Sequence, residues 1–260
     1  AATTIAIAKA SVDAFAEYEQ LVGGVETLFK GSSKKLIEYA NQAYKTAGLS
    51  ANQYMETVTS FSASLISSLN GDTEASAKAA NQAIIDMSDN ANKMGSDLST
   101  IQTAYAGFAK QNYTMLDNLK LGYGGTKTEM ERLLADAQKI SGIKYDISNL
   151  SDVYEAIHVI QTEMKISGLS YEEAMEKVAS GEMTLEEATE AMGTTAKEAT
   201  QTISGSVNAM QSAWTNLITG IADKNANFND LMYNSRNQFF RRKLSWHLKR
   251  SLLWLSRLRN

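Results

Sequence analysis

The 260-residue chain has no cysteine and no proline, and it carries a formal net charge of −4. The lack of cysteine excludes disulfides and thiolate chemistry, and with only two histidines, His158 and His247, a zinc site is hard to assemble. At the usual frequency of about 5 %, a chain of this length would contain roughly a dozen prolines, so their absence favours helices. We therefore expect an all-α fold, a multi-helix bundle of amphipathic helices broken by glycines, without a signal peptide or a membrane-spanning helix.

The first well-marked helix is expected to follow Gly48. The run "SANQ", Ser50 to Gln53, has the pattern of a capping box at a helix start. The run "NGD", Asn70 to Asp72, would end this helix, and Asp72 would cap the next one. Between them, one apolar stripe at helical spacing is expected to face the core: Tyr54, Val58, Phe61, Leu65 and Leu69.

The next segment contains a regular heptad pattern, which we call the helix-pairing seam. Its members alternate spacings of four and three residues, as in helices that pair in a coiled coil. Two arrangements are compatible with it: a continuous coiled coil with Asn112 fixing the register, or a compact bundle whose helices break near "MGSD" (94–97) and at Gly122. The seam consists of Ala80, Ile84, Met87, Ala91, Met94, Leu98, Ile101, Tyr105, Phe108, Asn112, Met115 and Leu119.

The stretch "GYGGTKT", from Gly122 to Thr128, superficially resembles a phosphate-binding loop. A P-loop needs a glycine five residues before its last glycine and a lysine directly after it, but Lys120 occupies the first position and Thr126 the second. The dinucleotide fingerprint fails as well, because Lys127 stands where its third glycine belongs. We therefore expect no nucleotide or other cofactor here, and interpret the stretch as a turn before a helix capped by Thr126 or Thr128.

Further helices are expected up to residue 223. One would run from 127 to Gly142, one from about 151 to Gly168 after a connector with a brief extended piece, and two short capped ones within 169–181 and 183–193. The pairs Glu172–Glu173 and Glu186–Glu187 are explained by helix first turns, where carboxylates complement the dipole. His158 is interpreted as a partly buried packing residue. A long amphipathic helix would follow, with this apolar face: Ile203, Val207, Met210, Trp214, Leu217 and Ile221.

The last 28 residues differ sharply in charge. Residues 233–260 contain eight basic residues and no acidic one; removing these eight from the 25 lysines and arginines leaves 17 basic against 29 acidic residues in the rest. Three interpretations remain open: a tail translated out of frame or past a truncation, a basic amphipathic helix suited to a membrane surface or an anionic partner, or a native helix that is buried. For the second, the candidate membrane-surface residues are Phe240, Leu244, Trp246, Leu248 and Trp254.

The sequence contains no recognisable catalytic or metal-binding constellation. It has neither a G-x-S-x-G elbow nor an H-E-x-x-H motif. We expect no enzyme, no metal and no cofactor. Composition and helix signals suggest three parts: a helical module at 1–145, a second helical segment at 146–232, and the basic tail at 233–260.

Two long segments resemble a known family. The run from Gly48 to Lys139, beginning "GLSANQYMETVTSF", and the run from Gly168 to Asp223, beginning "GLSYEEAMEKVASGEMTLEEA", are similar to tape measure proteins of long-tailed bacteriophages and of prophages of Gram-positive bacteria. The likeness extends over most of the chain to about Met232 and includes the glycine turn. Members of the family are normally much longer, so the resemblance implies a fragment or truncated copy.

The resemblance implies a structural role. Tape measure proteins are extended helical rods whose length sets the length of the tail tube, and they leave the tube during DNA delivery. If wholly helical, this chain would measure about 390 Å at 1.5 Å per residue. The implied partners are the tail tube protein and tail assembly chaperones, with self-association through helices and contact with the host membrane during ejection. The implied location is the tail lumen of the virion, and the host cytoplasm during assembly. The alternative from the residues alone is a helical interaction or effector-like bundle, or a membrane-active module, without catalytic activity.

Overall fold

The fold is all-α, as the sequence predicts. The computed structural model describes residues 2–169, 171–201 and 215–216. Within these ranges the only extended pairing is an isolated bridge between Leu169 and Met192. The helices are α1 (Ala2–Phe29), α2 (Ser33–Thr46), α3 (Ala51–Ser68), α4 (Thr73–Met94), α5 (Leu98–Phe108), α6 (Lys127–Ser141), α7 (Leu150–Glu163), α8 (Tyr171–Ala179), α9 (Leu185–Ala191) and α10 (Thr194–Gln201), with 3-10 turns η1 (Lys30–Ser32) and η2 (Leu116–Leu119).

Several helices begin at a side-chain cap that the sequence predicts. The predicted capping box at α3 is confirmed: Ser50 accepts from the Gln53 amide, and the Gln53 side chain accepts from the Ser50 amide. The predicted cap of α4 is also confirmed, because the Asp72 carboxylate accepts from the amides of Glu74 and Ala75. These side chains satisfy amide groups that have no partner inside their own helix.

The helix-pairing seam is divided between two helices. Helix α4 ends at Met94, Gly95 follows in the left-handed conformation with φ +61°, and Asp97 caps α5. Most seam residues from Ala80 to Phe108 are buried, on α4 and α5, which pack against each other. Asn112 is exposed in the turn after α5, where its side chain accepts from Thr114. Of the two arrangements, the structure therefore has the broken bundle, with the expected break near 94–97. The second break differs from the expectation, because α5 ends at Phe108 and not at Gly122.

The predicted stripe of α3 lies at the centre of the core. Tyr54, Val58, Phe61 and Leu65 are almost completely buried. Phe61 meets Tyr154 of α7 edge-on, with ring centroids 5.5 Å apart. An aromatic cluster thereby joins α3 and α7, and Tyr105 and Phe108 extend it onto α5.

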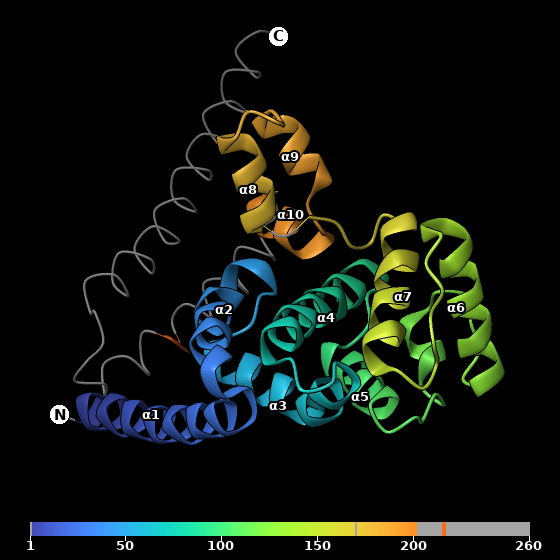
Figure 1. Ribbon diagram of the computed structural model, residues 1–260. Helices are drawn as coiled ribbons and strands as arrows, with labels where there is room; N and C mark the ends of the chain where they lie inside the picture. Colours follow the sequence, from blue (N-terminus) through green and yellow to red (C-terminus); the bar gives the residue numbers. More distant parts are fainter. Residues whose placement is uncertain (1, 170, 202–214, 217–260) are drawn as a thin grey trace, which may run out of the picture.

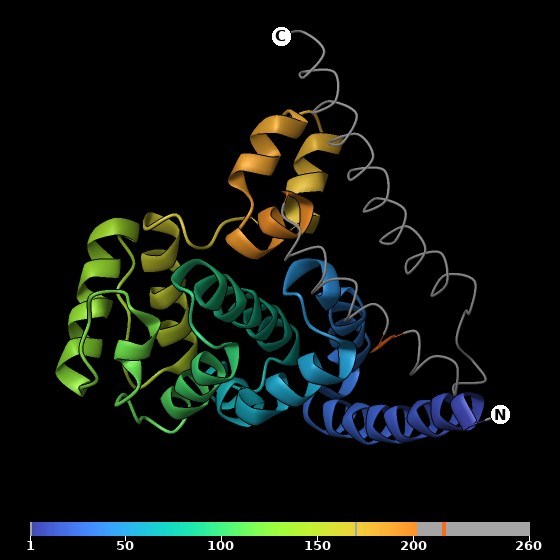
Figure 2. The ribbon, with the colours of Figure 1, turned by 180° about the vertical axis from the view of Figure 1, so that it is seen from behind.

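The helices form a bundle with two extensions (Figures 1 and 2). Helices α2, α3 and α4 lie at the centre, and α6 and α7 pack side by side at one end. Helix α1 packs on α3 and α2 through its C-terminal part, while its N-terminal part projects away from the bundle. Helices α8, α9 and α10 form a small group that sits on α2 and α4 through α10.

Another predicted helix end differs from the structure. Helix α7 ends at Glu163 rather than near Gly168, because Lys165 takes a left-handed conformation with φ +56°. The division between 1–145 and 146–232 falls inside one continuous hydrophobic core, which includes buried residues from Val25 to Ile166. A separate, smaller core comprises Ala174, Ala188, Met192 and Ala196, so the change of core lies near residue 167. The expected brief extended piece after Gly142 is absent from the described connector, which is an irregular loop.

Candidate functional site

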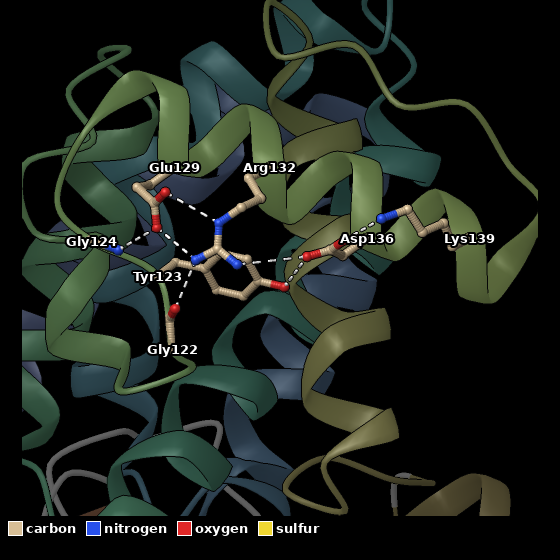
Figure 3. A network of polar contacts seen from close by, with 7 residues as sticks. All are labelled: Gly122, Tyr123, Gly124, Glu129, Arg132, Asp136 and Lys139. Carbon is tan, nitrogen blue, oxygen red and sulfur yellow. Dashed lines mark hydrogen bonds and ion pairs between the residues drawn. The ribbon is translucent and has the colours of Figure 1, made fainter.

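The glycine turn before α6 is closed by its own side chains (Figure 3). Glu129 accepts the amide of Gly124 at 2.9 Å and the Arg132 guanidinium at 2.6 Å. Thr126 caps α6 by accepting the Glu129 amide, which confirms one of the two predicted caps. The Gly124 amide and the Arg132 guanidinium are therefore both engaged by Glu129.

Arg132 connects this turn to the exposed face of α6. Its guanidinium lies over the Tyr123 ring, 4.3 Å from the centroid, and donates to the Gly122 carbonyl at 2.8 Å. The Tyr123 hydroxyl donates to Asp136, which also pairs with Lys139 at 2.8 Å. Opposite charges alternate along this network, so it locks the turn to the helix and leaves no uncompensated charge for a ligand.

The ionisation of this network follows from its contacts. The Arg132 guanidinium, with the Gly124 amide, lowers the pKa of Glu129 to about 2. Burial, followed by the hydrogen bond to Asp136, raises the pKa of Tyr123 to about 12. At neutral pH the Glu129 carboxylate is thus charged and accepts from Arg132. The Tyr123 phenol is neutral and can donate to Asp136.

Gly125 has a separate, steric role. A Cβ at this position would lie 2.2 Å from the Thr114 carbonyl oxygen, whereas a Cβ on Gly124 would meet only the Glu129 side chain, at 3.5 Å. Only glycine allows the turn to pass so close to the backbone at Thr114. Gly125 is thus explained by chain packing.

A second polar group lies inside the bundle, between α4 and α7. The Asp86 carboxylate, 1 % exposed, contacts Nδ1 of His158 at 2.9 Å, and Gln82 donates to the same carboxylate. Burial alone would lower the pKa of His158, but Asp86, with smaller contributions from Glu155 and Glu173, raises it to about 9. His158 is partly buried as predicted, but it forms an ion pair, which the sequence interpretation missed.

Asp89 lies one turn further along α4 and is completely buried. One of its oxygens accepts the Thr195 amide of α10 at 2.7 Å. Nearby, Gln161 of α7 donates to the Tyr105 hydroxyl at 3.1 Å. No local pattern predicts these contacts, because the partners of Asp86 and Asp89 lie 72 and 106 residues away in the chain.

The remaining candidates have structural explanations or lie outside the described residues. Glu187 completes a capping box with Thr184 at the start of α9, which agrees with the helix-start interpretation. The expected face from Ile203 to Ile221 and the five membrane-surface candidates of the basic tail, Phe240 to Trp254, fall outside the described ranges.

In the described part of the chain, no group of three or more acidic, histidine or cysteine side chains is arranged to hold a metal ion. None of the described helices is both long and apolar enough to cross a bilayer.

Comparisons with family models, with curated proteins and with solved structures found no match.

Proposed function

We propose that this chain is a folded helical part of a tape measure protein, which sets the length of a phage tail tube during assembly and is expelled during DNA delivery. The observation that carries the proposal is the resemblance of Gly48–Lys139 and Gly168–Asp223 to that family. The all-helical fold and the complete lack of proline are consistent with it.

The compact packing refines the proposed role. A length-setting rod uses about 1.5 Å of helix per residue, whereas α2 to α7 fold back on one another around a shared core. Residues 25–166 are therefore better suited to a globular element carried by the rod than to the rod itself. The proposed partners are the tail tube protein and tail assembly chaperones, with the host membrane as a contact at ejection. The proposed location is the tail lumen, after assembly in the host cytoplasm.

The buried charges bear on how such an element would leave the tube. Opening the bundle exposes Asp86 and His158 to water together, because they face each other across α4 and α7. An ion pair that is solvated on both sides after opening lowers the cost of unfolding relative to an entirely apolar interface. We infer that the bundle can open during passage and close again afterwards.

Tail assembly from purified or co-expressed components tests the proposal. The chain is expressed with the tail tube protein and the tail assembly chaperones of the same genome, and the tubes are isolated and measured by electron microscopy. The tryptic peptide from Leu133 to Lys139 identifies the chain in the tubes by mass spectrometry. The matched control omits the chain alone.

We expect this peptide in the tube fraction and a narrower distribution of tube lengths than in the control. A chain that stays in the soluble fraction, with tube lengths unchanged, would overturn the proposal. It would favour the alternative, a self-contained helical interaction module, which the continuous buried core of residues 25–166 supports.

A further inference from the structure

A buried polar contact joins the small group formed by α8, α9 and α10 to helix α4 of the bundle. Helix α10 follows Gly193, which has no side chain with which to cap the helix. Asp89 of α4 supplies the missing acceptor, because its Oδ1 accepts the Thr195 amide at 2.7 Å. A cap donated by another helix ties the helix start to that helix, so this contact couples the capping of α10 to its docking.

The fit around this contact is tight. A Cβ on Gly193 would lie 2.0 Å from Oδ2 of Asp89, so only glycine lets the carboxyl approach the start of α10. At the other end of the small group, a Cβ on Gly168 would lie 2.3 Å from the Ala191 carbonyl oxygen. The Leu169 amide donates to that same carbonyl at 2.8 Å, and the Thr194 amide donates to the Ile166 carbonyl at 3.1 Å.

The small group has its own core. Ala174, Ala188, Met192 and Ala196 pack together, apart from the core of residues 25–166. Figure 2 shows the group above α2 and α4, reached from α7 by a short connector. Such an arrangement allows the group to move as a unit if its tie to α4 weakens.

The surroundings of Asp89 disfavour a charge. The side chain is completely buried, and its Oδ2 has no hydrogen-bond partner among the described residues. An ionised carboxylate there would be desolvated with one oxygen unsatisfied, whereas a protonated carboxyl needs less solvation and keeps Oδ1 as the acceptor for Thr195.

Charged and titratable groups reach Asp89 from the neighbouring helices. Asp86 lies on the same helix, and its charge disfavours a second carboxylate. His158 of α7 acts in the opposite direction, and the Tyr105 phenol of α5 is also within electrostatic reach. Glu155 of α7 and Glu173 of α8 act on His158. Burial, the largest influence, outweighs the Thr195 amide and raises the pKa of Asp89 to about 7.

We propose that Asp89 is a proton-dependent latch, which in its neutral form holds α8, α9 and α10 on α4 and which loosens this group when it ionises. The direction follows from linkage, because a carboxyl whose pKa is higher in the docked than in the released state favours docking where it is protonated. Docking is therefore favoured in mild acid and lost as the pH rises through about 7. With an ordinary aspartate in the released state, the docking equilibrium falls roughly a hundredfold between about pH 5 and pH 8. The latch does not depend on the proposed tail function.

Hydrogen exchange on the full chain tests the latch. Exchange is measured at several pH values, corrected for the intrinsic rate, for α8 to α10 and for α3 as an internal reference. Asp89→Asn keeps an oxygen that accepts from Thr195 without a charge, whereas Asp89→Ala removes the cap. Asp72→Asn is the matched control, because Asp72 caps its own helix at the exposed surface.

In the unaltered chain, we expect the protection of α8 to α10 against hydrogen exchange, relative to α3, to fall by about two orders of magnitude between about pH 5 and pH 8. Asp89→Asn should keep the group protected at every pH, Asp89→Ala should release it at every pH, and Asp72→Asn should leave the profile unchanged. If Asp89→Asn does not fold, His158→Gln decides. It should retain the fall in protection but move it to higher pH, because the charge of His158 lowers the pKa of Asp89. The latch is refuted by a flat profile in the unaltered chain, by a profile that persists in Asp89→Asn, or by one that disappears in His158→Gln.

Discussion

At the scale of single residues, close backbone approaches and buried charges explain the positions that the sequence pattern left ambiguous. Gly125 has to be glycine because the chain passes the Thr114 carbonyl at that point, and no ligand is needed to explain it. His158 carries a charge over an extended pH range because the buried Asp86 carboxylate faces it. Each explanation leads to a measurement on a single variant.

Gly125→Ala should destabilise the bundle by about 2 kcal/mol, because its Cβ would meet a backbone oxygen that cannot rotate away. Chemical denaturation followed by circular dichroism measures this difference. Gly124→Ala is the matched control and should stay within about 0.5 kcal/mol, since its nearest contact is a flexible side chain. Equal effects of the two substitutions would contradict the steric role of Gly125.

The His158–Asp86 pair should make stability depend on pH. Because the pKa of His158 is about 9 in the folded chain and 6.5 as a reference, the pair stabilises fully below about pH 6.5 and is lost as the pH rises through about 9. The change in the free energy of unfolding across this window should be on the order of 3 kcal/mol. Denaturation at a series of pH values measures it.

His158→Gln is the control for that series. The amide can still donate to Asp86 but does not titrate, so the dependence between about pH 6.5 and 9 should disappear. If His158→Gln keeps the full pH dependence of stability, a group other than the His158–Asp86 pair causes it.

At the scale of helices, the starts were predictable and the distant contacts were not. Ser50, Asp72 and Thr126 cap their own helices, and such signals are complete within four residues of sequence. The end of α7 was placed too late because Lys165, a residue with no special preference for it, takes the left-handed conformation. The contacts of Asp86 and Asp89 depend on how α4, α7 and α10 pack, and no spacing in the sequence encodes that packing.

Asp72→Ala should remove the cap of α4 and cost about 1 kcal/mol of stability. The loss arises because the amides of Glu74 and Ala75 would lose their acceptor. Thermal or chemical unfolding measures the difference. Asp72→Asn retains an accepting oxygen and should recover most of the loss; if it is as unstable as the alanine variant, the charge and not the hydrogen bond is what matters.

At the scale of the whole molecule, the described residues form one large core and one small core in a chain that we propose to be part of a length-setting protein. The seam residues from Ala80 to Phe108 lie on two packed helices, because α4 ends before Gly95 and Asp97 caps α5. The bundle is therefore shorter than a continuous helix of the same residues, and a rod-like function depends on how residues outside it are arranged.

The proposal that residue number sets tail length is tested most directly by lengthening the chain. Helical segments of about 20 and 40 residues are inserted between Asp223 and Lys224, outside the core of residues 25–166, and tails assembled with each variant are measured by electron microscopy. We predict tails longer by about 30 and 60 Å respectively, at 1.5 Å per added residue. Tails of unchanged length that contain the lengthened protein would contradict the proposed function.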